Sequence, residues 1–203
     1  MKKLLERIKL CKLPPPQRRS LPFECYWEDS ILTQEQERIF SNQWLGLGRS
    51  DRLENPGEYE VFDLCGQALV LIRNQDKELK LYANTCRHRG AKLLDGSGQC
   101  QAISCPFHGW TYSLDGNLKH AKTMEENPSF DFAEHSLIEY KLKELQGFLF
   151  VFLGNKPTDL SNQLGNFSEL HQPWSMNELV TTRRATFEVQ CNWKAFLDVF
   201  NEY

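Results

Sequence analysis

The chain has 203 residues and a formal net charge of −3 at pH 7, so its size fits one domain and part of another. This charge gives no reason to expect a nucleic-acid partner. Because no apolar run is long enough to span a bilayer and charges interrupt the N-terminal MKKLLERIKLCKL, we expect a cytoplasmic protein with no membrane segment.

The first fifty residues predict a short amphipathic helix, an extended arm and a second helix. Three consecutive prolines exclude helix and paired strand over residues 13–21 because they fix φ and remove N–H donors. Thr33 and Gln36 form a capping-box pattern that predicts a helix start. We expect this helix to reach Trp44 and to end at Gly46.

A period-two apolar pattern then predicts strands. Residues 59–61, 68–73 (ALVLIR) and 78–83 (ELKLYA) are separated by short turn sequences, which predicts a three-stranded antiparallel meander. The last strand ends shortly before Cys86. We therefore expect rigid strands to position a loop that carries functional groups.

Two short motifs follow, each with one thiol and one imidazole. Cys86 and His88 form a C-x-H pair, Cys105 and His108 form a C-x-x-H pair, and sixteen residues separate the two pairs. Gly90 follows the first pair, while a proline and a glycine bracket the second histidine. Both loops therefore carry residues suited to tight bends around a metal.

Two cysteines and two histidines are compatible with two metal centres. They can form a tetrahedral zinc site, or they can hold a [2Fe–2S] cluster in which one iron takes two thiolates and the other takes two imidazoles. Zinc sites commonly pair like residues in each half of the motif. The mixed pairing in each loop favours the cluster.

At these residues the chain resembles a known family. The segments CRHRG and CPFHGWTYSLDG are similar to the cluster-binding motif of Rieske non-haem iron oxygenases, the large subunits of ring-hydroxylating dioxygenases and related monooxygenases. Respiratory Rieske proteins have an extra cysteine in each loop, and those two form a disulfide. Ala91 and Phe107 stand near those places here, which favours the oxygenase branch.

The motif is embedded in predicted hairpins. Residues 101–104 and 110–113 predict short strands, and 114–117 predict a type I′-like turn into a strand over 118–120. We thus expect a cluster-binding subdomain over about 84–120. Trp110 and Phe107 are predicted to wall the cluster off from water.

The remaining β strands are predicted at 137–145 and 148–153, after a polar loop over 122–134. Together these elements predict a mainly β fold, a Rieske-type antiparallel β-sandwich with a small hairpin-based cluster-binding subdomain, flanked by helices and the start of an α+β catalytic domain. We place the boundaries of the three parts at 1–50, 51–155 and 156–203.

The C-terminal part predicts a helix, a strand and a helix. Asp159 is expected to cap a helix that reaches about residue 171. Residues 181–191 predict a strand with Phe187 and Val189 facing inward. Asn192 is expected to cap a final helix.

In that final helix the apolar residues recur at i, i+3, i+4 and i+7, which predicts one apolar face. We also expect an ion pair between Lys194 and Asp198. The NWK sequence at 192–194 resembles the start of the oxygenases' catalytic domain. The mononuclear iron ligands would follow Tyr203, so we expect this chain alone to lack oxygenase turnover.

Counted from NWK, Glu202 falls where many family members carry the acid that links the cluster of one subunit to the iron of the next. A solvent-exposed glutamate on a helix face is the alternative interpretation. The other histidines, His120, His135 and His171, are interpreted as structural or exposed. Five cysteines without paired spacing are interpreted as small buried residues in a reducing compartment: Cys11, Cys25, Cys65, Cys100 and Cys191.

The resemblance implies an oxidoreductase. It implies single-electron transfer by a [2Fe–2S] cluster to a mononuclear Fe(II), which in the full-length family uses O2 to hydroxylate or oxidise an aromatic or quaternary-amine-type substrate. It also implies a reductase or ferredoxin as electron donor and a homo-oligomer, a trimer in the full-length family. A stand-alone Rieske-type electron carrier and a zinc-stabilised module are the alternatives.

Overall fold

The computed structural model describes residues 2–200 and places them in two compact units. One unit combines the residues up to Ile39 with those from Arg184 onwards, and the other is Phe40–Arg183. Glu202, the predicted bridging acid, and Tyr203 lie outside the described residues.

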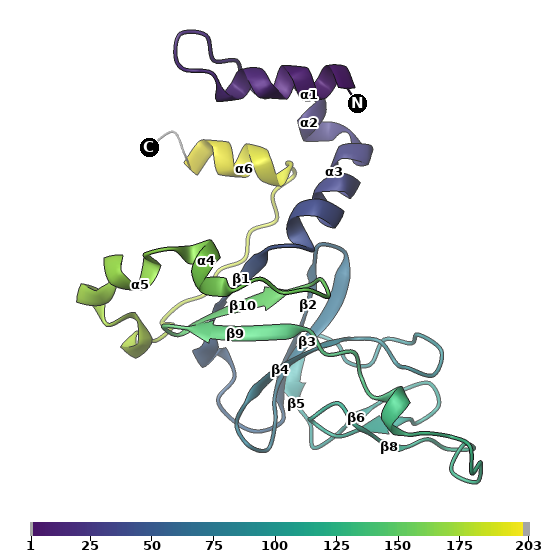
Figure 1. The fold of residues 1–203 in the computed structure, drawn as a ribbon. Coiled ribbons are helices and arrows are strands. Elements are labelled where there is room, and N and C mark those ends of the chain that lie inside the picture. Colours follow the sequence, from purple (N-terminus) through teal and green to yellow (C-terminus); the bar gives the residue numbers. More distant parts are fainter. Residues whose placement is uncertain (1, 201–203) are drawn as a thin grey trace. The chain divides into compact units, whose positions relative to one another are not determined.

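The larger unit is built on antiparallel sheets (Figure 1). The first sheet has the order β1 (Trp44–Arg49), β10 (Phe148–Phe152) and β9 (Lys141–Leu145). The second has the order β4 (Leu79–Ala83), β3 (Gln67–Arg73), β2 (Glu58–Leu64) and β5 (Ser97–Gln99). The predicted mainly β fold is confirmed, and so is the meander of β2, β3 and β4.

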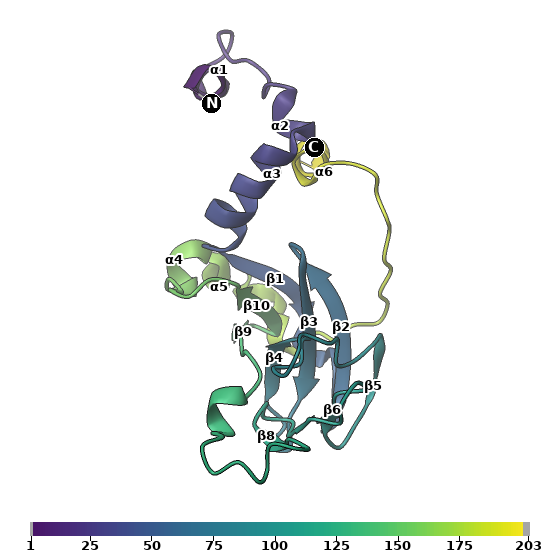
Figure 2. The same cartoon turned by 90° about the vertical axis from the view of Figure 1, so that its right-hand side faces the viewer.

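A third, small sheet consists of β6 (Ile103–Ser104), β7 (Thr111–Tyr112) and β8 (Leu118–His120). It lies beyond one end of the β2–β3–β4 sheet in both views (Figures 1 and 2). The two cysteine–histidine motifs flank β5 and β6 in the sequence. The small sheet therefore connects the candidate site to the larger sheet.

The central strand β3 explains why the core has two sides. Leu69 and Leu71 point into one apolar cluster, while Val70 and Ile72 point into another. Successive side chains of a strand face opposite ways, so a strand buried on both faces reads as a continuous apolar run. The ALVLIR sequence has this form, and each fully buried aliphatic side chain contributes about 2 kcal/mol.

The predicted helix before the sheet differs from the observed one. α3 begins earlier, at Asp29–Glu35, and continues as the π-helical turn η2 (Gln36–Phe40). Trp44 does not end the helix but begins β1, where its buried ring packs edge-on against Phe152. Gly46 also lies within β1, at a bulge rather than at a helix end. Tertiary burial of the tryptophan outweighs the local helix signal.

Two details of the hairpin region also differ from expectation. Residues 97–99 form strand β5, which was not predicted, because they pair with β2. In the β7–β8 turn only Gly116 has a positive φ, of 76°. A type I′ turn needs two such residues, so this is a type I turn followed by a left-handed glycine.

Two short helices follow β10, where a single helix to about residue 171 was predicted, because Gly165 ends the first of them. They are α4 (Leu160–Leu164) and α5 (Phe167–Leu170). The Asp159 side chain accepts a hydrogen bond from the Ser161 N–H, which caps α4. The short 3-10 turns are η1 (Leu10–Lys12), η3 (Ser50–Arg52), η4 (Ala133–His135), η5 (Gln172–Trp174) and η6 (Met176–Glu178).

The predicted strand over 181–191 is wrong. No described strand pairs with this segment, and the side chain of Phe187 is 82% exposed. Val189 is also exposed rather than inward-facing. Alternating apolar residues specify a strand only where a neighbouring edge supplies hydrogen bonds, and the described structure supplies none here.

The smaller unit holds the helices α1 (Lys2–Lys9), α2 (Glu24–Trp27), α3 and α6 (Trp193–Phe200). Asn192 caps α6 as predicted. The predicted Lys194–Asp198 pair does not form, since Lys194 Nζ lies 2.7 Å from Glu35 Oε2 and Asp198 accepts a hydrogen bond from Tyr26. Among the described residues no helix is both long enough and apolar enough to cross a bilayer.

Candidate metal centre

The two motif loops have different sequences but the same hydrogen-bond pattern. The N–H groups of Cys86 and Cys105 each donate to the carbonyl five residues ahead, at 2.8 Å. Four residues after each cysteine, Gly90 and Gly109 donate back to the cysteine carbonyl at 3.0 Å. C-x-H and C-x-x-H thus build equivalent tight loops.

These glycines are required by backbone conformation rather than by space. Gly90 has a φ of 73° and Gly109 has a φ of 71°, a region that other residues enter only with strain. A Cβ atom at either position would meet nothing within 4 Å. The glycines therefore allow the sharp turn that sends each loop back toward the sheet.

The structure places the two predicted cysteines in one buried cluster and the two predicted histidines side by side at half-buried positions. Cys86 and Cys105 are buried in one apolar cluster. His88 and His108 are half-buried, and their ring centroids lie 4.8 Å apart. The donor set is therefore sorted into a buried thiol pair and an outer imidazole pair.

Tyr112 links to the buried end of the site, a role that sequence reasoning missed. Its hydroxyl lies 3.3 Å from the Cys86 sulfur and accepts a hydrogen bond from the Arg87 N–H at 3.0 Å. Burial and the contact with Cys86 raise the pKa of Tyr112, so the phenol keeps its proton. The period-two alternation of Trp110 and Tyr112 was the available signal for inward-facing side chains.

His88 has the properties of a free metal ligand. Its Nδ1 atom is buried and makes no hydrogen bond. Burial and the nearby Arg89 guanidinium lower the pKa of His88, which favours the neutral imidazole that metals bind. An unpartnered buried nitrogen is costly unless a ligand or metal uses it, so the site fits a metal cofactor.

Only one of the two aromatic residues predicted to exclude water does so. Trp110 is 2% exposed and stacks on the His88 ring, with centroids 4.7 Å apart and planes 10° apart. Phe107 is 66% exposed. The prediction for Phe107 is wrong because its position in the second loop points its ring outward, beside His108.

A groove of about 570 Å³ opens at the histidine end of the site. Its lining includes the cations Arg89 and Lys122 and no carboxylate. The outer faces of the site are thus positively charged and open to a partner group. The lining residues are His88, Arg89, Phe107, His108, Gly109, Lys122, Thr123 and Met124.

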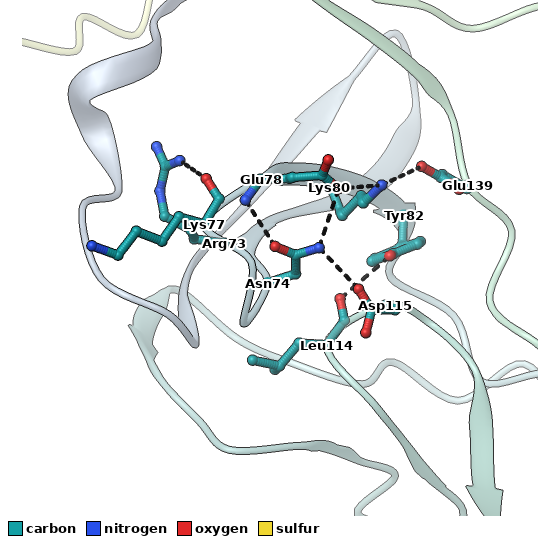
Figure 3. A network of polar contacts seen from close by, with 9 residues as sticks. All are labelled: Arg73, Asn74, Lys77, Glu78, Lys80, Tyr82, Leu114, Asp115 and Glu139. Atoms are coloured by element: carbon teal, nitrogen blue, oxygen red, sulfur yellow. Dashed lines mark hydrogen bonds and ion pairs between the residues drawn. The ribbon is translucent and has the colours of Figure 1, made fainter.

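A buried amide ties the hairpin of the site to the large sheet (Figure 3). Asn74, 1% exposed, donates to the Asp115 carboxylate at 2.9 Å and accepts from the Glu78 N–H at 2.8 Å. Tyr82 donates to the Leu114 carbonyl at 3.3 Å. These bonds position the β7–β8 hairpin, which follows the second motif directly.

No group of three or more His, Cys, Asp or Glu side chains among residues 2–200 is arranged to hold a single metal ion. A Rieske cluster needs only two protein ligands on each of its two irons. All seven cysteines are free thiols.

Comparisons with known proteins agree with this geometry. Residues 43–136 match the model of the Rieske [2Fe–2S] domain. Over 191 residues the chain is 31% identical to the carnitine monooxygenase oxygenase subunit of Escherichia coli K12, covering 93% of this chain and 51% of that protein. It is 28% identical to the glycine betaine monooxygenase oxygenase subunit of Chromohalobacter salexigens, covering 88% and 40%.

A solved structure is similar over the same region. The quaternary ammonium Rieske monooxygenase CntA in complex with L-carnitine superimposes with a TM-score of 0.81 at 33% identity, covering 88% of this chain and 52% of that chain. The chain spans about half the length of the curated relatives it matches. It contains a Rieske [2Fe–2S] domain, and its homologues are Rieske oxygenase subunits, of which it matches the N-terminal portion.

Proposed function

We propose that Cys86, His88, Cys105 and His108 hold a [2Fe–2S] cluster and that the domain transfers single electrons. The observation that carries the proposal is the sorting of the donors into a buried thiol pair and an outer imidazole pair. This is the donor set of a Rieske centre. The domain match favours the cluster over the zinc alternative.

When bound, such a cluster supplies one-electron chemistry at a potential of roughly −150 to +300 mV. The protein's own residues determine the surroundings of the cluster's proposed ligands. Tyr112 places a hydroxyl against the Cys86 sulfur, and Trp110 keeps water from one face of His88. The groove at the histidines leaves the outer end accessible to a redox partner.

We also infer that the complete protein is an oxygenase acting on a quaternary ammonium compound. The named relatives at 27% to 34% identity are carnitine and glycine betaine monooxygenase oxygenase subunits. Alignment extends over 93% of the chain, well beyond residues 43–136, which argues against a stand-alone electron carrier. The proposal includes a reductase or ferredoxin donor, a homo-oligomer, a mononuclear Fe(II) and a cytoplasmic location.

Cluster binding is tested by anaerobic purification of the chain and four single variants. We expect two irons and two sulfides per wild-type chain, with a reduced-state EPR signal. The substitutions C86A, C105A, H88A and H108A should each abolish most of this loading. C100A is the matched control, because Cys100 packs against the same apolar cluster without belonging to a motif. Bound zinc, or full loading of C105A, would refute the proposal.

The substrate class is tested with the protein from the complete reading frame and an electron donor. We expect oxygen consumption coupled to product formation with carnitine, glycine betaine or choline. Uncharged isosteres, in which a tert-butyl group replaces trimethylammonium, should react at least tenfold more slowly because a cation site cannot hold them. Equal rates for the isosteres, or a preference for naphthalene, would overturn this inference.

A further inference from the structure

The ring of His88 is oriented by stacking rather than by hydrogen bonding. Metal-bound histidines usually donate their second ring N–H to an acceptor, and that bond fixes the ring. In the described structure His88 makes no ring hydrogen bond, and its Nδ1 atom is buried. Instead its ring lies parallel to the buried indole of Trp110, 4.7 Å away.

The indole itself contacts two further aromatic rings. Phe130 and His135 meet Trp110 edge-on, at centroid distances of 5.6 and 5.7 Å and interplanar angles of 80° and 72°. These two rings also stack on each other at 4.4 Å. Four aromatic rings therefore run in continuous contact from His88 to the 130–135 turn.

Hydrogen bonds within residues 131–135 fix the conformation of that turn. His135 Nδ1 lies 2.8 Å from the Asp131 carbonyl oxygen, and the Asp131 carboxylate accepts a hydrogen bond from the Ala133 N–H at 2.8 Å. The His135 N–H also donates to the Phe132 carbonyl. His135 is thus fixed at both its ring and its backbone, which makes it a firm support for Trp110.

The rings of the two outer histidines, His88 and His108, differ in the contacts that hold them. His108 contacts Phe107, whose ring is mostly exposed, and the edge of His88. No buried ring among the described residues lies parallel to His108. One imidazole of the pair is therefore held by a rigid aromatic stack, and the other is not.

We propose that Trp110 is a positioning residue that sets the ring plane of His88, and that Phe130 and His135 hold Trp110 in place. This rests on the proposed cluster-binding function. Stacking restrains rotation of the imidazole about its bonds while leaving both ring nitrogens free for other partners. His135, a histidine outside both motifs, then contributes to the geometry of the centre without touching it.

The experiment uses the cluster-loaded chain and the variants W110F, W110L and H135A. Pulsed EPR on the reduced cluster measures the couplings of the two ligand-histidine nitrogens, which depend on ring orientation. Iron, sulfide and circular dichroism accompany each variant. H171A is the matched control, because His171 Nδ1 also meets the carbonyl oxygen four residues earlier. Among residues 2–200 the aromatic rings that its ring contacts are those of Phe167 and Trp174, away from the motifs.

We expect W110L and H135A to change one nitrogen coupling and leave the other as in wild type. W110F should restore most of the wild-type coupling, and H171A should change neither. Unchanged couplings in fully loaded W110L and H135A would overturn the proposal. Should W110L bind no cluster, H135A decides, because it keeps the indole.

If the H135A variant binds no cluster, its circular dichroism spectrum decides whether the proposal holds. Lost loading with an intact circular dichroism spectrum supports the proposal, since only the ligand is then misplaced. Lost loading together with lost sheet signal counts against it, because the stack would then support the fold and not His88. A wild-type chain without any cluster refutes the proposed function itself.

Discussion

The hydroxyl of Tyr112 is a single polar atom that meets the buried end of the metal centre. It accepts from the Arg87 N–H and lies 3.3 Å from the Cys86 sulfur. If Cys86 is a thiolate, as a cluster ligand would be, the sulfur can only accept, so the Tyr112 hydroxyl is the donor in this contact. A hydrogen bond to a thiolate stabilises the more negative, reduced state of a cluster more than the oxidised state. Tyr112 should therefore raise the reduction potential.

We predict that Y112F lowers the reduction potential of the loaded chain by about 60 mV, the one-electron equivalent of about 1.4 kcal/mol. The measurement is a redox titration followed by EPR. Y140F is the control, because it removes a tyrosine hydroxyl that bonds Gln67 away from the motifs. An unchanged or higher potential in Y112F would show that its hydroxyl does not act on the sulfur.

At the scale of elements, the β7–β8 hairpin depends on close packing at its turn. Gly116 has a φ of 76°, and a Cβ there would lie 2.7 Å from the Tyr82 ring. The same Tyr82 donates to the Leu114 carbonyl. The turn, the tyrosine and the hairpin that follows the second motif thus form one packed unit.

We predict that G116A destabilises the chain by about 3 kcal/mol, combining backbone strain with a clash against a buried ring. G66A is a matched control, since Gly66 has a φ of 78° with nothing within 4 Å of the added Cβ. It should cost about 1 kcal/mol, from strain alone. Denaturant unfolding measures the free energy of unfolding of both variants. Equal losses of stability would show that the Tyr82 ring moves to accommodate the added methyl group at little cost.

At the scale of the molecule, all four proposed ligands belong to the unit Phe40–Arg183. A cofactor that binds only the folded state stabilises the structure that its ligands hold. The thiols lie in the apolar cluster that contains Val70 and Ile72, so this effect extends from the loops into β3.

We predict that cluster loading slows amide hydrogen exchange at residues 84–121 and in β3, by tenfold or more. Exchange in α6 should stay the same in the loaded and cluster-free chains, because α6 belongs to the other unit and holds no ligand. Hydrogen exchange with mass spectrometry measures both. If cluster loading slowed amide exchange in α6 as much as in the motif loops, the stabilisation would not be confined to the unit that holds the ligands.

The sequence by itself determined the meander, the cluster-binding motifs and the mainly β fold. Each of these depends on local patterns, namely alternation in β2–β4, glycine after the cysteine–histidine pairs, and thiol and imidazole at short spacing. Structure can be predicted from such patterns because residues close together in the sequence are also close together within one strand, turn or helix. The cap at Asp159 was predictable for the same reason.

Only the tertiary structure decided which distant residues support the site. Three contacts join residues far apart in the sequence, and no local pattern predicts their partners. They are the hydroxyl–sulfur contact of Tyr112 with Cys86, the stacking of Trp110 on His88 and the hydrogen bond from Asn74 to Asp115. The same holds for the errors. Trp44 became a strand residue because a core required it, and residues 181–191 formed no strand because alternation without a pairing edge leaves backbone groups to water.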